Sequence, residues 1–111
     1  MESPNPVVDE EGNKKWFNSS GQLHRLGGPA IEWANGDKLW FQNGQLHRIG
    51  GPAMEFASGN KSWFQNGLHH RENGPAVEWI NGYKAWYLNG QRYRVEGPPI
   101  EYADNTKKYE K

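Results

Sequence analysis

The chain has 111 residues, 13 basic and 13 acidic side chains, no cysteine and a formal net charge of zero. The lack of cysteine excludes disulfides, thiolate nucleophiles and cysteine-ligated metal centres. The charge balance gives no strong field for nucleic acid or an acidic membrane, and no apolar run reaches the roughly 18–20 residues of a membrane span. The first residues also lack the basic and apolar regions of a signal peptide, so we expect a cytoplasmic protein.

Residues 1–11 are predicted to form a disordered tail, and residues 12–111 a single domain of about four 23-residue units. The period is set by Trp16, Trp40, Trp63 and Trp86, which follow one another after 24, 23 and 23 residues. Six Trp residues are among the 15 aromatic residues, and most of these fall on repeat positions. An aromatic ring can bury roughly 150–250 Å², so we expect a thin aromatic core laid out along a line.

Two kinds of turn alternate within each unit. One series is Asn43-Gly44, Asn66-Gly67 and Asn89-Gly90, and the other is Asn35-Gly36, Ser58-Gly59 and Asn81-Gly82. Asn-Gly tolerates positive φ at both central positions, which a two-residue type I′ hairpin requires. The segments between the turns are rich in aromatic and β-branched residues, so they are predicted to be strands. The predicted fold is all-β, an elongated and twisted antiparallel meander of stacked hairpins.

The register follows from pairing outward from each turn. Around Asn35-Gly36 it places Trp33 opposite Lys38 and Ile31 opposite Trp40, and the last unit places Ile100 opposite Tyr109. We therefore expect one face with aliphatic side chains on Trp rings and with aromatic rings under Lys stems. The opposite face should carry the Glu column. Its members are Glu32, Glu55, Glu78 and Glu101.

The unit Trp-x-x-Asn-Gly-x-x-His, followed by Gly, an aromatic residue and a Gly turn, resembles MORN repeats over residues 12–111. Here Arg follows the histidine, and the variant Asn-Gly-x-x-His-Arg-x-x-Gly-Pro-Ala resembles repeats of phage, giant-virus and bacterial proteins. The resemblance implies stacked hairpins with an open groove, and binding to proteins or sometimes to membrane lipids. It also suggests a phage or viral inhibitor of a host defence protein, acting in the host cytoplasm.

One histidine recurs in each of the first three units. The column is His24, His47 and His70, with Tyr93 in the fourth place and His69 beside His70. With two strands per unit, neighbours in the column lie about 9–10 Å apart, too far to share one metal ion. We therefore predict no metal and no cofactor, and interpret the column as structural or facing a partner. His69 and His70 should point to opposite faces of their strand.

An arginine column and the deviations from the repeat complete the candidate surface. Arg25, Arg48, Arg71 and Arg94 either pair with the Glu column or grip acidic groups of a partner. The deviations are an extra Ser at Ser19-Ser20 in unit one, His69-His70 and Glu72-Asn73 in unit three, and Arg92, Tyr93 and Tyr83 in unit four. The candidate binding residues are thus Arg25, Arg48, Arg71, Arg94, His24, His47, His69, His70, Glu72, Arg92 and Tyr93.

A repeated side-chain set argues against catalysis, because an active site needs one distinct constellation. We therefore predict a non-catalytic module that binds another protein through a face rich in Trp, His and Arg, residue types common in binding hot spots. The alternatives are a binder of nucleotide-like anions and, with less support, a membrane-surface binder. Nucleic acid is not an expected partner. The open sheet edges also permit an edge-to-edge homodimer.

Overall fold

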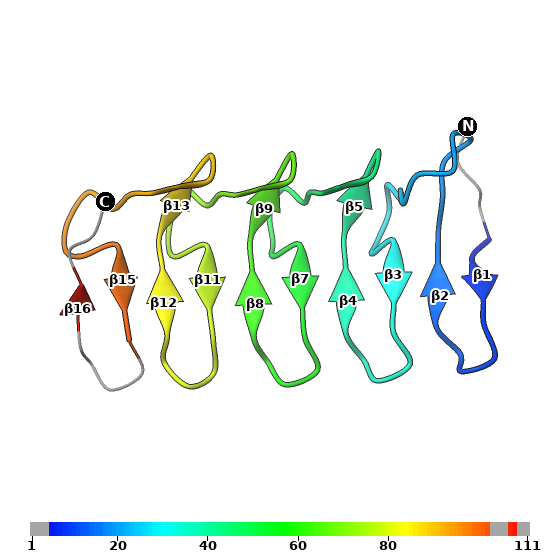
Figure 1. Cartoon of the computed structure of the whole chain (residues 1–111), viewed down its shortest axis with the longest axis horizontal. Coiled ribbons are helices and arrows are strands. Elements are labelled where there is room, and N and C mark those ends of the chain that lie inside the picture. The colour runs from blue at the N-terminus through cyan, green and yellow to red at the C-terminus, as the bar shows by residue number, and fades with distance from the viewer. Residues whose placement is uncertain (1–4, 103–106, 109–111) are drawn as a thin grey trace.

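The computed structural model describes residues 5–102 and the backbone of residues 107–108. In this part of the chain, ten two-residue strands form one antiparallel sheet in the order β1-β2-β3-β4-β7-β8-β11-β12-β15-β16 (Figure 1). Their bounds are β1 Val7–Val8, β2 Lys14–Lys15, β3 Ile31–Glu32, β4 Lys38–Leu39, β7 Met54–Glu55, β8 Lys61–Ser62, β11 Val77–Glu78, β12 Lys84–Ala85, β15 Ile100–Glu101 and β16 Lys107–Lys108. The all-β hairpin meander predicted from the sequence is confirmed.

Three small hairpins stand along one side of this sheet (Figure 1). They are β5 (Phe41–Gln42) with β6 (Gln45–Leu46), β9 (Phe64–Gln65) with β10 (Leu68–His69), and β13 (Tyr87–Leu88) with β14 (Gln91–Arg92). In the first unit, a single bridge between Phe17 and Leu23 occupies the equivalent place. We call the turns of these hairpins the upper turns, and those of the long sheet the lower turns.

The molecule is long and thin. Ten strands about 4.8 Å apart span roughly 43 Å, close to the longest dimension of 44 Å, and the other two dimensions are 25 and 18 Å. The radius of gyration is 15.5 Å, against about 13 Å for a compact domain of this length. Each unit therefore contacts mainly its two neighbours, as expected for a repeat array.

The upper turns have the geometry predicted from Asn-Gly. Both central residues have positive φ, 50° and 81° at Asn43 and Gly44, and the same holds at positions 66–67 and 89–90. Gln42 pairs with Gln45, so the loop holds two residues. The first upper turn contains the inserted Ser and closes with three residues, because the amide of Asn18 donates to the carbonyl of Gln22.

The predicted register at the lower turns is wrong by one residue. Ile31 lies opposite Leu39 and Glu32 opposite Lys38, and not opposite Trp40 and Leu39 as a two-residue turn requires. The loop holds three residues, because Trp33 donates its amide to Asp37 and accepts from Gly36, which has φ +102°. This is a type I turn with a glycine bulge. Asn35 accepts from the amide of Asp37 through its side chain and keeps negative φ.

The corrected register separates the side chains into two rows. From β3 to β15 one row is apolar or small, and we call its side of the sheet the apolar face: Ile31, Leu39, Met54, Ser62, Val77, Ala85 and Ile100. In β2, Lys15 lies in this row, opposite Ile31. The other row alternates in charge and defines the charged face: Lys14, Glu32, Lys38, Glu55, Lys61, Glu78, Lys84 and Glu101. Opposite charges on adjacent strands contribute roughly 0.2–1 kcal/mol per pair. Each Glu of the column therefore lies opposite a Lys on the adjacent strand.

Four of the eight buried hydrophobic residues in the described part of the chain lie on the apolar face, and the other four, Trp16, Ala30, Ala53 and Ala76, lie outside its row. Ile31, Val77, Ala85 and Ile100 are at most 7% exposed. Tyr87 from the side of the upper turns and Tyr83 and Tyr102 from the side of the lower turns pack against the C-terminal part of this row. The C-terminal part of this face is thus covered by aromatic rings from the two margins of the sheet. The predicted partner of Ile100, Tyr109, lies outside the described residues.

The sheet extends further toward the N-terminus than the predicted boundary at residue 12. β1 pairs with β2, placing Val7 opposite Lys15 and Val8 opposite Lys14. The turn between them is closed by Asp9, whose carboxylate accepts from the side chain and backbone of Asn13. These hydrogen bonds lower the pKa of Asp9. Asp9 makes the backbone hydrogen bonds that Trp33 makes in the next unit, so an acidic residue stands at an aromatic position of the repeat, which hid this turn in the sequence.

Candidate functional site

An arginine stack is repeated four times on the charged face. The guanidinium carbon of each Arg lies 3.7–3.9 Å from the centroid of a Trp ring in the pairs Arg25–Trp16, Arg48–Trp40, Arg71–Trp63 and Arg94–Trp86. The same guanidinium donates to the carbonyl of the proline four residues later. Such a stack contributes roughly 0.5–2 kcal/mol, depending on its exposure. Each arginine is thereby held against the sheet.

Each arginine also forms an ion pair with the Glu column. The pairs are Arg25–Glu32 at 3.4 Å, Arg48–Glu55 at 3.1 Å, Arg71–Glu78 at 3.1 Å and Arg94–Glu101 at 2.6 Å. The pairing with the Glu column that the sequence left as one option is therefore present. Because each guanidinium contacts a ring, a carbonyl and a carboxylate, its main role is structural. The carboxylate also neutralises its charge locally.

The histidines of the column connect one unit to the next. Nδ1 of His24, His47 and His70 accepts a hydrogen bond of 3.0 Å from the amide of Asn43, Asn66 and Asn89, respectively. Because a backbone N–H can only donate, this nitrogen is unprotonated and the neutral ring carries its proton on Nε2. Each histidine thus fixes the upper turn of the following unit.

A second set of acceptors does the same at the lower turns. The side chains of Asn13, Asp37 and Asn60 accept from the amides of Ala34, Ala57 and Ile80, at 2.7, 2.7 and 3.0 Å. Two side-chain hydrogen bonds therefore link each of the first three units to the next. In the fourth unit, the corresponding positions hold Tyr83 and Tyr93.

The two adjacent histidines have different surroundings, as the sequence predicted. The His69 ring lies 4.1 Å from the Phe64 centroid and 4.9 Å from that of Tyr87. Burial between these rings lowers its pKa below the ordinary value of 6.5. His70 is 8% exposed, and its Nε2 lies 3.4 Å from a carboxylate oxygen of Glu72. His69 thus belongs to an aromatic row, and His70 to the face of the arginines.

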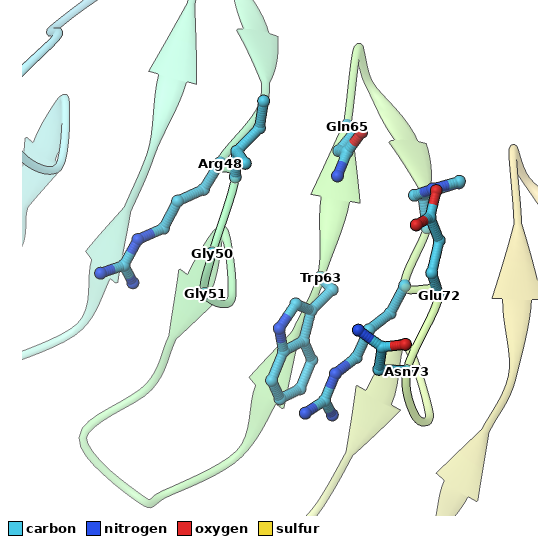
Figure 2. A pocket seen from close by; sticks show the side chains of 10 residues that line it. Arg48, Gly50, Gly51, Trp63, Gln65, Glu72 and Asn73 are labelled. Atoms are coloured by element: carbon cyan, nitrogen blue, oxygen red, sulfur yellow. The ribbon is translucent and has the colours of Figure 1, made fainter.

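Two equivalent hollows open between successive Gly-Pro loops, which are residues 25–29, 48–52 and 71–75. The first hollow, about 590 Å³, is lined by Arg25, Leu26, Gly27, Gly28, Pro29, Trp40, Gln42, His47, Arg48 and Ile49. The second, about 510 Å³, is lined by Arg48, Ile49, Gly50, Gly51, Trp63, Gln65, His70, Arg71, Glu72 and Asn73. Figure 2 shows the Trp63 indole standing between the loop of Gly50 and Gly51 and the segment with Glu72 and Asn73.

Comparison of the chain with protein-family models, curated proteins and solved structures finds no match. The MORN-type resemblance therefore remains a prediction from the residues.

Most of the predicted surface residues line a hollow. Arg25, Arg48, Arg71, His47, His70 and Glu72 belong to the two hollows above, and Arg92, Tyr93 and Arg94 to a separate one near the end of the fourth unit. His69 lies in the aromatic row, and His24 lines neither of the two equivalent hollows. No three His, Asp or Glu side chains of residues 5–102 and 107–108 are placed to share a metal ion.

Sequence reasoning missed the exposed aliphatic residues and the glutamines. Leu26, Ile49 and Val95 follow the arginines of their loops and are 66, 75 and 82% exposed. An aliphatic residue in a glycine-rich loop, outside the alternation of the strands, was the available signal. Gln42 and Gln65 occupy the same position after Trp-Phe in two units, which also marked them as equivalent. The described part of the chain contains no helix long and apolar enough to cross a membrane.

Proposed function

We propose that the protein is a non-catalytic scaffold that binds another protein through the charged face, at the hollows between the Gly-Pro loops. The exposed aliphatic residues of these loops carry the proposal. Of the 14 Ile, Leu and Val residues in the chain, seven are strongly exposed. In a chain with few aliphatic residues, leaving half of them exposed gives up much of the apolar burial that could stabilise the fold. Exposed apolar groups on a rigid frame are typical of interaction sites.

The ion pairs support a protein partner over an anionic ligand. Each arginine beneath the hollows faces a carboxylate within 3.4 Å, so the row offers little net positive charge to a phosphate. A protein surface with apolar groups matches Leu26 and Ile49 better. The resemblance to phage and giant-virus repeats suggests a specific form of this proposal, a small inhibitor that binds a host defence protein.

The test is a pull-down from a host lysate with three forms of the protein. Ile49→Ser removes an exposed side chain of the proposed face, and Ile80→Ser removes one of similar exposure, 69%, on a lower turn. We expect a partner that is retained by wild type and Ile80→Ser and lost with Ile49→Ser. Identical partner lists for all three forms would contradict the proposal. Arginine variants are unsuitable, because each loses a ring contact and an ion pair that hold the units together.

A further inference from the structure

The spacing of the hollows limits the shape of a bound chain. Trp40 and Trp63 are equivalent residues of successive units, separated by two strand spacings, about 9.5 Å. A polyproline II helix advances about 3.1 Å per residue with three residues per turn, so one turn measures about 9.3 Å. The two-residue repeat of a β-strand is about 6.8 Å, and two α-helical turns measure about 10.8 Å. Among these conformations, polyproline II matches the period of the units most closely.

The first hollow presents hydrogen-bond donors, whereas in the second hollow Nε2 of His70 already lies 3.4 Å from the Glu72 carboxylate. His47 lines the first hollow, and because its Nδ1 accepts from Asn66, the neutral ring carries its donor hydrogen on Nε2. Trp40 and Gln42, whose side chains each carry N–H groups, line the same hollow. Proline has a carbonyl but no backbone N–H, so a proline-rich chain offers the acceptors that such a surface requires.

The charge and the shape of the surface also fit a proline-rich chain. None of the ten residues that line the first hollow is acidic, and its two arginines are paired with Glu32 and Glu55. An uncharged ligand is therefore complementary to it. Leu26 and Ile49 stand on successive loops as apolar ridges, and Trp63 forms a ring wall beside the loop of Gly50 and Gly51 (Figure 2). Aromatic walls and apolar ridges are the usual contacts of proline rings.

We infer that the partner segment is an uncharged, proline-rich peptide in the polyproline II conformation, lying along the long axis and placing one turn in each hollow. This inference rests on the proposed function and names the chemistry of its partner. Ten residues of such a helix are about 31 Å long, enough to cover both hollows and the loops that flank them.

The experiment measures the fluorescence anisotropy of labelled decaproline titrated with the intact protein. A Gly-Ser peptide of equal length with the same label is the control for conformation and composition. We expect saturable binding of decaproline only. The Ile49→Ser variant should weaken it about tenfold, the effect of losing one large aliphatic contact, and Ile80→Ser should leave it unchanged. Hexaproline, which spans fewer units, should bind more weakly than decaproline.

The remaining outcomes separate the inference from the proposed function. Absent or non-saturable decaproline binding overturns the inference, and an Ile49-dependent partner in the pull-down would still support the scaffold. Equal loss of decaproline binding in Ile49→Ser and Ile80→Ser also overturns the inference, since it points to a change outside the hollows. If Ile49→Ser alters neither decaproline binding nor partner retention, both proposals fail. Circular dichroism of each variant verifies that the sheet is intact.

Discussion

The interior boundaries between units differ from the last boundary in how they are held. At each of the first three, a histidine and an Asn or Asp side chain accept hydrogen bonds from the turns of the next unit. At the fourth, Tyr93 and Tyr83 occupy these positions. The arginine–glutamate pair is present at all four, with Arg94–Glu101 the shortest at 2.6 Å.

The difference shows that two kinds of interaction hold neighbouring units of the same fold together. Interior boundaries use directional hydrogen bonds to turn amides, which fix the position of each turn. The last boundary uses rings: Tyr83 lies 4.9 Å from the Trp79 centroid and 5.6 Å from that of Tyr102. The repeat therefore changes its residues at this boundary.

The largest effect is expected from removing both acceptors at one interior boundary. The double variant Asp37→Ala, His47→Ala leaves the amides of Ala57 and Asn66 without these partners. We expect a loss of about 1–2 kcal/mol in the free energy of unfolding, because two hydrogen bonds of modest net strength are lost. Urea denaturation followed by tryptophan fluorescence measures this loss. A double variant as stable as wild type would show that the boundary is held by the sheet and the ion pair alone.

A smaller effect is expected at the last boundary. Tyr83→Asn installs the residue type found at the interior positions, but removes the ring between Trp79 and Tyr102. Aromatic pairs contribute about 0.5–1.5 kcal/mol beyond their burial, so we expect a loss of about 1 kcal/mol confined to the C-terminal units. Hydrogen exchange should show faster exchange at β11 and β12 than at β3 and β4. Uniform acceleration along the chain would contradict a local role for Tyr83.

The pH dependence distinguishes the third unit from the second. Burial lowers the pKa of His69 in the folded chain below its ordinary value of 6.5. At a pH between this lowered pKa and the ordinary pKa of the unfolded chain, the unfolded chain binds more protons than the folded chain. The free energy of unfolding then falls as the pH drops below about 6.5. His69→Leu, which copies Leu46 of the second unit, should reduce the loss of Tm between about pH 7.5 and about pH 5.5. An unchanged pH profile would assign the acid sensitivity to other groups.

The smallest effect is expected at Tyr93. This side chain is 51% exposed. Tyr93→His should change the free energy of unfolding by less than about 0.5 kcal/mol, as is usual for exposed positions. Thermal unfolding beside the Tyr83→Asn variant measures this. A marked stabilisation would show that a histidine finds an acceptor role there after all.

The period and the turn residues determined how much of the fold was predictable. Asn43-Gly44 predicts a two-residue turn because both residues accept positive φ, and the structure has it. Asn35-Gly36 has the same letters but forms a three-residue turn, since the Asn35 side chain binds the amide of Asp37. The side-chain pattern held the missing information: only the shifted register places Glu32 beside Lys38 and Ile31 beside Leu39.

The candidate site was predictable by residue type but not by role. The sequence predicted a face rich in Trp, His and Arg, and the structure places Trp40, His47 and Arg48 around the first hollow. The hydrogen bond from the Asn66 amide to His47 joins residues 19 apart, and a local motif does not reveal it. The exposure of Ile49 could not be derived while the loop geometry was unknown.

The inserted serine of the first upper turn shows where the array tolerates a change in length. That turn has three residues, yet Phe17 still lies opposite Leu23, as Phe41 lies opposite Leu46. In this turn the side chain of Asn18 accepts from the amide of Ser20, whereas in the next unit a histidine accepts from the amide of Asn43. The later upper turns are each held by one and keep two residues. Foreign loops for display or labelling should therefore be accommodated at Ser19-Ser20, whereas lengthening a later turn would detach it from its neighbour.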